Sequence, residues 1–190
     1  MSKHADDLIQ ILRDNCERVY TGAEIGVMQG DTSAELLKAF PNLNLRMVDL
    51  WKDHPEGSDY WNSGDQCSRI SSDSQAANAL RAMEATRFAE KRRHIMRKGS
   101  LEAAKLVADS SLDFAFIDAD HTYEAVNADL YAWYPKVCVG GVICGHDYGH
   151  PRDRRGVWGV SRAVDQFFAY TGLEVRSGPS TVWWVSKQVC

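Results

Sequence analysis

Apolar runs and amphipathic stretches alternate along almost the whole chain of 190 residues. Stretches with apolar residues three and four positions apart predict helices, and short, mostly apolar runs predict strands buried on both faces, as in parallel sheets. The predicted helices span residues 5–17, 32–40, 75–90, 100–107, 122–134 and 160–170, and the predicted strands span 21–26, 45–50, 94–97, 114–118, 139–145, 173–177 and 181–186. This alternation predicts an α/β fold, Rossmann-like and doubly wound around a seven-stranded sheet.

The last two predicted strands are connected differently from the others. Residues 173–177 and 181–186 are separated only by Gly178-Pro179-Ser180, a spacing that is typical of a hairpin. We therefore expect an antiparallel C-terminal hairpin strand in an otherwise mostly parallel sheet. A single domain over residues 1–190, with an N-terminal helix within residues 1–19, accounts for the pattern. A dinucleotide-binding domain does not normally end in such a hairpin.

A glycine-containing turn follows the first predicted strand. Glu24-Ile25-Gly26-Val27-Met28-Gln29-Gly30 leads into the helix that starts near Thr32, and the next strand ends at Asp49, 19 residues after Gly30. A nucleoside cofactor needs this layout, because glycines let the backbone approach the ligand and the acid accepts hydrogen bonds from the ribose hydroxyls. The pattern Glu-x-Gly-x-x-x-Gly lacks the third glycine of a pyrophosphate site, and its carboxylate would suit an ammonium or sulfonium group. The alternative is a strand–turn–helix unit that binds no ligand.

Composition limits the classes of partner. Hydrophobic residues make up 44% and charged residues 25% of the chain, as in soluble globular proteins. The net charge of −4 argues against nucleic acid, and the basic run 87–98 is interpreted as the solvated end of a helix. The longest apolar run, 137–144, is too short to cross a membrane. Five cysteines without metal spacing or a secretion signal predict reduced thiols in the cytoplasm, and self-association into a homo-oligomer stays open.

Acids and histidines follow two of the central strands. Asp118-Ala119-Asp120-His121 ends one apolar strand, and His146-Asp147 ends the next, with His150 close behind. Open α/β sheets place their sites at the carboxyl ends of the strands, so these groups are expected to meet at one edge. Asp120 is a candidate for orienting His121. The alternative is that His146 and Asp147 only shape a loop.

Two polar segments are candidates for the walls of a substrate site. Residues 52–74 are turn-rich and long for a connection in a compact domain, which is typical of a lid or an acceptor-binding loop. Residues 149–156 contain Arg152, Arg154 and Arg155, which could receive an acidic acceptor or simply form a solvated loop. The sequence leaves the role of these arginines open.

At this point the chain resembles the class I S-adenosylmethionine-dependent methyltransferases, in particular the small bacterial sugar and antibiotic O-methyltransferases. The resembling segments are 24–32, 116–124, 140–148 and 181–185, in family order. The resemblance implies that S-adenosyl-L-methionine is the cofactor and assigns its contacts. Glu24 and Gly26 would line the methionine end, Gly30 would allow close approach, Thr32 would hold the carboxylate, Asp49 would bind the ribose, Trp51 would cover the adenine and Ser100 would contact its edge. Asp118 is a further candidate residue of the cofactor pocket.

The resemblance also implies O-methylation of a small hydroxylated acceptor, with the help of a base, a metal or both. Metal-dependent relatives have acids where Asp118 and Asp147 stand and a base at the position of His121, three residues after the first acid. His146 is the further candidate ligand, and the ion would be Mg²⁺ or Mn²⁺; an imidazole ligand suits Mn²⁺ better. Tyr148 stands where catechol-type enzymes have Asn, and His146 where sugar-type enzymes have Glu. An NAD-type oxidoreductase and a non-catalytic nucleoside-binding domain are the alternatives.

Overall fold

The computed structural model describes residues 3–65 and 67–188. Seven strands form one sheet: β1 Thr21–Ile25, β2 Asn44–Asp49, β3 Arg93–Arg97, β4 Leu112–Ile117, β5 Val137–Gly145, β6 Arg176–Ser177 and β7 Trp183–Ser186. Their order in the sheet is β3-β2-β1-β4-β5-β7-β6. Neighbours among β1 to β5 are parallel, whereas β7 runs antiparallel to both β5 and β6. The predicted doubly wound fold and its antiparallel C-terminal hairpin are confirmed.

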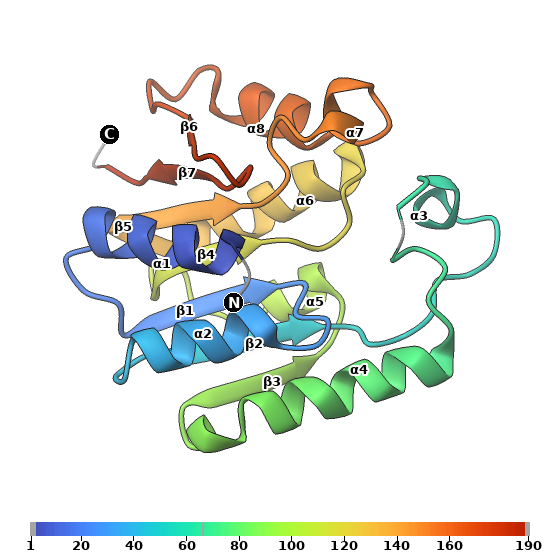
Figure 1. Ribbon diagram of the computed structural model, residues 1–190. Coiled ribbons are helices and arrows are strands. Elements are labelled where there is room, and N and C mark those ends of the chain that lie inside the picture. The colour runs from blue at the N-terminus through green and yellow to red at the C-terminus, as the bar shows by residue number, and fades with distance from the viewer. Residues whose placement is uncertain (1–2, 66, 189–190) are drawn as a thin grey trace.

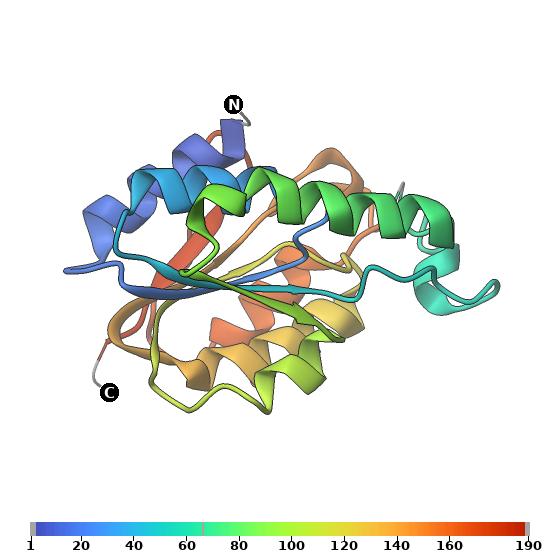
Figure 2. The same ribbon diagram turned by 90° about the horizontal axis from the view of Figure 1, so that it is seen from below.

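Helices cover both faces of the sheet (Figure 1). They are α1 Lys3–Asn15, α2 Asp31–Ala39, α3 Asp59–Asn62, α4 Ser72–Ala85, α5 Ser100–Ala104, α6 Tyr123–Trp133, α7 Pro151–Arg154 and α8 Val160–Phe168. Figure 2 shows α1, α2 and α4 on one face and α5, α6 and α8 on the other. The short helix α3 extends beyond the edge where the parallel strands end (Figure 1).

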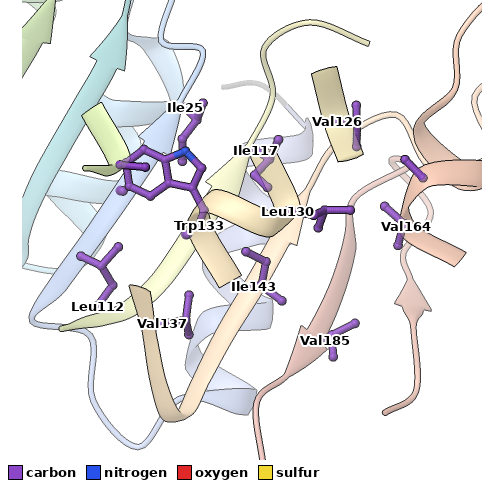
Figure 3. Packing of buried hydrophobic residues seen from close by; sticks show 14 of the residues in the cluster. Ile25, Leu112, Ile117, Val126, Leu130, Trp133, Val137, Ile143, Val164 and Val185 are labelled. Carbon is purple, nitrogen blue, oxygen red and sulfur yellow. The ribbon is translucent and has the colours of Figure 1, made fainter. Parts of the chain in front are cut away.

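The strands supply side chains to a hydrophobic core on each face. In β4, Ala115 and Ile117 pack towards α6 and α8, whereas Phe114 and Phe116 pack towards α1 and α2. This alternation follows from the two-residue period of a strand, and it explains why β4 is apolar at almost every position. Figure 3 shows Ile117 and Trp133 in the first of these cores. Burial on both faces leaves the strand ends as the places where polar side chains can gather.

Three segments differ from the predicted elements. The region 52–74 is not one loop, because it contains α3 and the first turn of α4. The side chain of Ser71 accepts a hydrogen bond from the Ser74 amide, and this cap starts α4 three residues before the predicted position. The predicted strand 173–177 is reduced to Arg176–Ser177 at the sheet edge. Among the described helices, none has the length and apolar composition that a membrane span requires.

Candidate active site

The turn after β1 brings the ends of three strands together. Gly26 has a φ of 92°, and a Cβ at this position would lie 2.0 Å from the carbonyl oxygen of Asp118. The Gly26 amide donates to Val48 of β2 over 2.9 Å, and the Asp118 amide donates to Ile25 over 2.8 Å. Glycine is therefore required at position 26 by both conformation and space. A Cβ on Gly30 would lie 2.8 Å from Cα of Ala82, so Gly30 also allows α4 to pack closely against the start of α2.

Asp49, the predicted ribose ligand, holds this turn in the structure. Its carboxylate accepts hydrogen bonds from the amides of Val27 over 3.0 Å, Met28 over 2.8 Å and Trp51 over 2.7 Å. A carboxylate has about four acceptor positions, so one remains for a ligand. Asp49 thus joins the end of β2 to the turn after β1, at the place where the resemblance puts the ribose.

Glu24 contacts the first turn of α2, which also contains Thr32. Glu24 is only 2% exposed and accepts a hydrogen bond from the Ser33 hydroxyl. Burial raises the pKa of Glu24 to about 8; the Ser33 hydrogen bond opposes the shift, and nearby carboxylates, Asp118 first among them, add to it. Thr32 Oγ1 lies 2.8 Å from Nε2 of His4, so the beginning of α1 covers this end of the site.

Trp51 and Ser100 are held by protein contacts. Trp51 is buried, and its indole nitrogen donates to the Met28 carbonyl over 2.7 Å. The Ser100 hydroxyl donates to Asp129 and accepts from the Trp133 indole over 2.8 Å. Their predicted adenine contacts stay predictions, and the Ser100 hydroxyl is already used within the α5–α6 contact.

Asp118, His121 and Asp147 meet at the ends of the neighbouring strands β4 and β5. Nε2 of His121 lies 2.9 Å from Oδ2 of Asp147 and 3.5 Å from Oδ1 of Asp118. One candidate ligand atom from each of the three residues lies within 4.8 Å of the others. Asp147 is buried and has a φ of 64°, a left-handed conformation that is rare for a side chain other than glycine. The edge of the sheet therefore brings together the residues that the sequence predicted there.

The ring of His121 is fixed on two sides. Nδ1 is hydrogen-bonded to the Asp65 carboxylate, and the Trp158 ring stacks on its face with centroids 4.4 Å apart and an interplanar angle of 21°. Nε2 is buried, and no described group accepts a hydrogen bond along its direction, although Asp147 is near enough for an ion-pair contact. Burial alone lowers the pKa of His121, but Asp118, Asp147 and Asp65 outweigh it and raise the pKa to about 12.

His146 lies beside the cluster and contacts Asp147. Its Nδ1 is 3.2 Å from Oδ2 of Asp147 and 3.8 Å from Oδ1 of Asp118, and its Nε2 donates to the Ser180 carbonyl over 2.9 Å. Burial lowers the pKa of His146, but the hydrogen bond with Asp147 and the nearby carboxylates outweigh it and raise the pKa. Burial in turn raises the pKa of Asp147, and its close contacts with the two histidines outweigh it and lower the pKa. His146 thus orients the Asp147 carboxylate.

Sequence reasoning missed Asp65 and Trp158, and it misplaced Asp120. Asp120 accepts a hydrogen bond from the Thr122 amide over 2.7 Å and so shapes the turn before α6, whereas Asp65 is the acid that contacts His121. Asp65 lies 56 residues before His121, in a segment without periodicity, so no local pattern connects the two. Loop side chains reach a site through tertiary packing that spacing does not encode.

Comparison with known protein families identifies the family of the chain. A family model described as a methyltransferase domain matches residues 23–148, more than half of the chain. The chain belongs to this methyltransferase family. The predicted S-adenosylmethionine-dependent methyltransferase is thereby confirmed, and S-adenosyl-L-methionine is its cofactor. The family match favours the methyltransferase over the two alternatives, an NAD-type oxidoreductase and a non-catalytic nucleoside-binding domain.

Solved structures of low sequence identity share the methyltransferase fold. A Corynebacterium glutamicum protein has a TM-score of 0.71 at 15% identity, with 100% of this chain and 82% of that chain covered. The O-methyltransferase NovP gives 0.65 at 18% identity, covering 98% and 80%. The calicheamicin methyltransferase CalS11 gives 0.66 at 15% identity, covering 97% and 80%.

A curated relative matches only part of the methyltransferase. The protein y4gI of Sinorhizobium fredii, described as uncharacterized, is 36% identical over 64 residues. This match spans 34% of the methyltransferase and 7% of the length of y4gI.

Proposed function

We propose that the methyltransferase transfers its methyl group to a hydroxyl oxygen of a small acceptor, with a divalent cation held by Asp118, Asp147 and His121. The observation that carries the proposal is the meeting of these three side chains at the ends of β4 and β5. Two structures with the same fold, NovP and a Staphylococcus aureus protein, bear O-methyltransferase names. An alcohol keeps its proton at neutral pH, so oxygen methylation needs a group that lowers the hydroxyl pKa or removes the proton.

The donor atoms fit a cation. Two carboxylates supply negative charge, and the buried Nε2 of His121 faces them without an aligned acceptor among the described residues. Because the donors are two oxygens and one imidazole nitrogen, Mn²⁺ or Fe²⁺ fits better than Mg²⁺, which prefers oxygen ligands. His146, the other predicted ligand, lies behind Asp147, where it would orient that ligand.

The chain's own residues have distinct parts in this proposal. A cation bound here would lower the pKa of the acceptor hydroxyl. Asp118 and Asp147 fix the place where that hydroxyl would lie. Glu24 would lose its proton next to the positively charged cofactor and attract that charge, and Asp49 would bind the ribose with its remaining acceptor position. This leaves the methyl donor and the acceptor side by side at the edge of the sheet, which is the positioning that methyl transfer needs.

A second role for His121 is that of general base, as its spacing from Asp118 predicts. The hydrogen bond from Nδ1 to Asp65 favours it, because a base needs a partner that orients its ring. Without a cation, the pKa of about 12 opposes it, because Nε2 would have to lose a proton before it could accept one from the acceptor. A cation held by Asp118 and Asp147 would offset the carboxylate charges that raise this pKa and would take the place of the proton on Nε2, so we propose the ligand role first and keep the base role as the second candidate.

The acceptor would lie between the segments 52–74 and 149–156, which we propose as the walls of its site. Arg152 donates to the Gly64 carbonyl and so connects the two segments. Arg155 donates to the Pro151 carbonyl over 3.1 Å. Both arginines are thus engaged in protein contacts, which favours a structural role over the binding of an acidic acceptor; the side chain of Arg154 lies outside the described part. The cytoplasmic location and self-association stay predictions.

The metal is tested by stripping and reloading the enzyme. S-adenosylhomocysteine formation is measured with a panel of phenols, catechols and sugars, before and after EDTA treatment and with Mn²⁺, Fe²⁺ or Mg²⁺ restored. We expect activity to disappear with EDTA and to return best with Mn²⁺ or Fe²⁺, whereas Asp147→Asn should not be restored by any ion. Asp109→Asn, a change at a carboxylate that is 70% exposed, is the matched control. Full activity in excess EDTA, with no metal detected by mass spectrometry, would contradict the cation and leave His121 as the base.

A further inference from the structure

Asp65 is a buried acid that comes from outside the sheet edge and contacts His121. It lies in the segment between α3 and α4 and is only 4% exposed. One carboxylate oxygen accepts the Cys67 amide over 2.7 Å, and the other is bonded to Nδ1 of His121. The backbone of Asp65 is also held, because its carbonyl accepts from the Ser68 hydroxyl over 2.8 Å and its amide donates to the Ser63 hydroxyl over 3.2 Å. The carboxylate is therefore held in a fixed place before any ligand binds.

The contact decides which nitrogen of His121 faces the cluster. A carboxylate only accepts hydrogen bonds, so Nδ1 must carry the proton. Nε2, on the other side of the ring, then faces Asp118 and Asp147 and would offer its lone pair to a cation that takes the place of a proton there. Trp158 stacks on the ring face and leaves the in-plane hydrogen bond to Asp65 as the contact that sets the rotation of the ring.

We propose that Asp65 is the positioning residue of His121: it fixes the proton on Nδ1 and directs Nε2 to the place between Asp118 and Asp147. The proposal rests on the proposed function, in which His121 acts through Nε2. Carboxylates that bond the second nitrogen of a metal-binding histidine orient the ring and strengthen its binding of the metal.

The position of Asp65 in the chain adds a consequence. Its neighbour Gly64 accepts a hydrogen bond from Arg152, and the Arg152 guanidinium lies over the Trp158 ring, 5.4 Å from the centroid. The same stretch of chain therefore places the carboxylate against His121 and reaches the segment 149–156. A displacement of residues 64–65 would remove the contact that orients the His121 ring. The placement of this segment and the orientation of His121 are therefore coupled.

The test compares Asp65→Asn and Asp65→Ala with the wild type and with Asp59→Asn, a change at an exposed acid of α3. The first measurement is the NMR signal of the His121 Nδ1 proton, which a strong bond to a carboxylate shifts far downfield. The second is the affinity for Co²⁺, read from its visible absorption. We expect the downfield signal in the wild type and in Asp59→Asn, and its loss in Asp65→Ala. Co²⁺ affinity should fall about 10-fold in Asp65→Asn, whose amide oxygen can still accept from Nδ1, and up to about 100-fold in Asp65→Ala.

The outcomes separate this proposal from the proposed function. A wild type that binds no Co²⁺ but shows the downfield signal, lost in Asp65→Ala, removes the cation and supports the positioning of His121. A wild type without the signal overturns the proposal, whether or not it binds Co²⁺. An Asp65→Ala protein that stays folded in urea titration and binds Co²⁺ as tightly as the wild type also overturns it, because Asp65 would then only anchor its own segment.

Discussion

Replacement of Glu24 by Gln is expected to stabilise the protein and to weaken cofactor binding. Glu24 is almost fully buried, and its one described hydrogen bond comes from the Ser33 hydroxyl. Gln can accept the same hydrogen bond through its amide oxygen and never ionises. The change therefore removes the cost of a buried negative charge and keeps the shape of the side chain.

The size of the effect follows from the pKa of Glu24, which burial raises from 4.5 to about 8. Each unit of difference between the pKa of Glu24 in the folded protein and in the unfolded chain corresponds to about 1.4 kcal/mol of unfolding free energy. Between these two pKa values the folded protein binds more protons than the unfolded chain, so the stability of the wild type falls as the pH rises from 4.5 to 8. The destabilisation by Glu24 is about 1 kcal/mol at pH 5 and about 4 kcal/mol at pH 8. The difference in unfolding free energy between Glu24→Gln and the wild type should therefore grow by about 3 kcal/mol over this range.

Urea unfolding at several pH values measures this difference, and Glu102→Gln, a change at an exposed acid of α5, serves as the control. Because Glu24→Gln is compared with the wild type at each pH, the contributions of the other titrating groups cancel. Titration calorimetry with S-adenosylmethionine above pH 8, where Glu24 is mostly ionised, then tests the expected loss of cofactor affinity, since Gln cannot attract the positive charges of the cofactor. A stability difference that stays constant from pH 5 to pH 8 would refute the buried charge, and unchanged cofactor affinity would remove Glu24 from the site.

Two other substitutions test the turn after β1. Asp49→Ala leaves three amide groups without their acceptor and removes the ribose ligand, so cofactor affinity should fall by roughly 1–3 kcal/mol and the unfolding free energy should also fall; calorimetry and urea unfolding measure the two, and unchanged values of both would contradict the assigned contacts. Gly26→Ala places a Cβ against the Asp118 carbonyl at a positive φ, so it should lose well over about 1 kcal/mol of stability or fail to fold; a normally stable variant would show that the strand ends can move apart.

The fold was predictable because its signals are local or periodic. The apolar strand 114–118 predicts burial on both faces, and the short connection of 173–177 to 181–186 predicts the hairpin. The boundaries were less predictable, since they depend on single contacts. The Ser71 cap that starts α4 early is an example, because serine also occurs throughout the preceding loop.

The site was predictable where it rests on the sheet. Asp118 and Asp147 follow strands that turn out to be neighbours, so their carboxylates must meet at the same edge. The role of Asp49 was predictable only in part, because the sequence indicates a ligand contact but not the hydrogen bonds that the same carboxylate accepts from three amides. The role of Asp65 could not be predicted, because its contact with His121 depends on how a segment without periodicity folds back over the site.

Acceptor preference is expected to depend jointly on the segments 52–74 and 149–156. Gly64 accepts a hydrogen bond from Arg152, Arg152 lies over Trp158, Trp158 stacks on His121, and His121 bonds to Asp65, the neighbour of Gly64. These contacts form a closed ring through three distant parts of the chain. Because each contact holds the next in place, a change in either segment is expected to displace the other and also His121. A substitution that adapts only one segment to a new acceptor should therefore lower the rate of methyl transfer before it changes the preference, whereas paired changes in both segments can alter the preference and keep His121 in position.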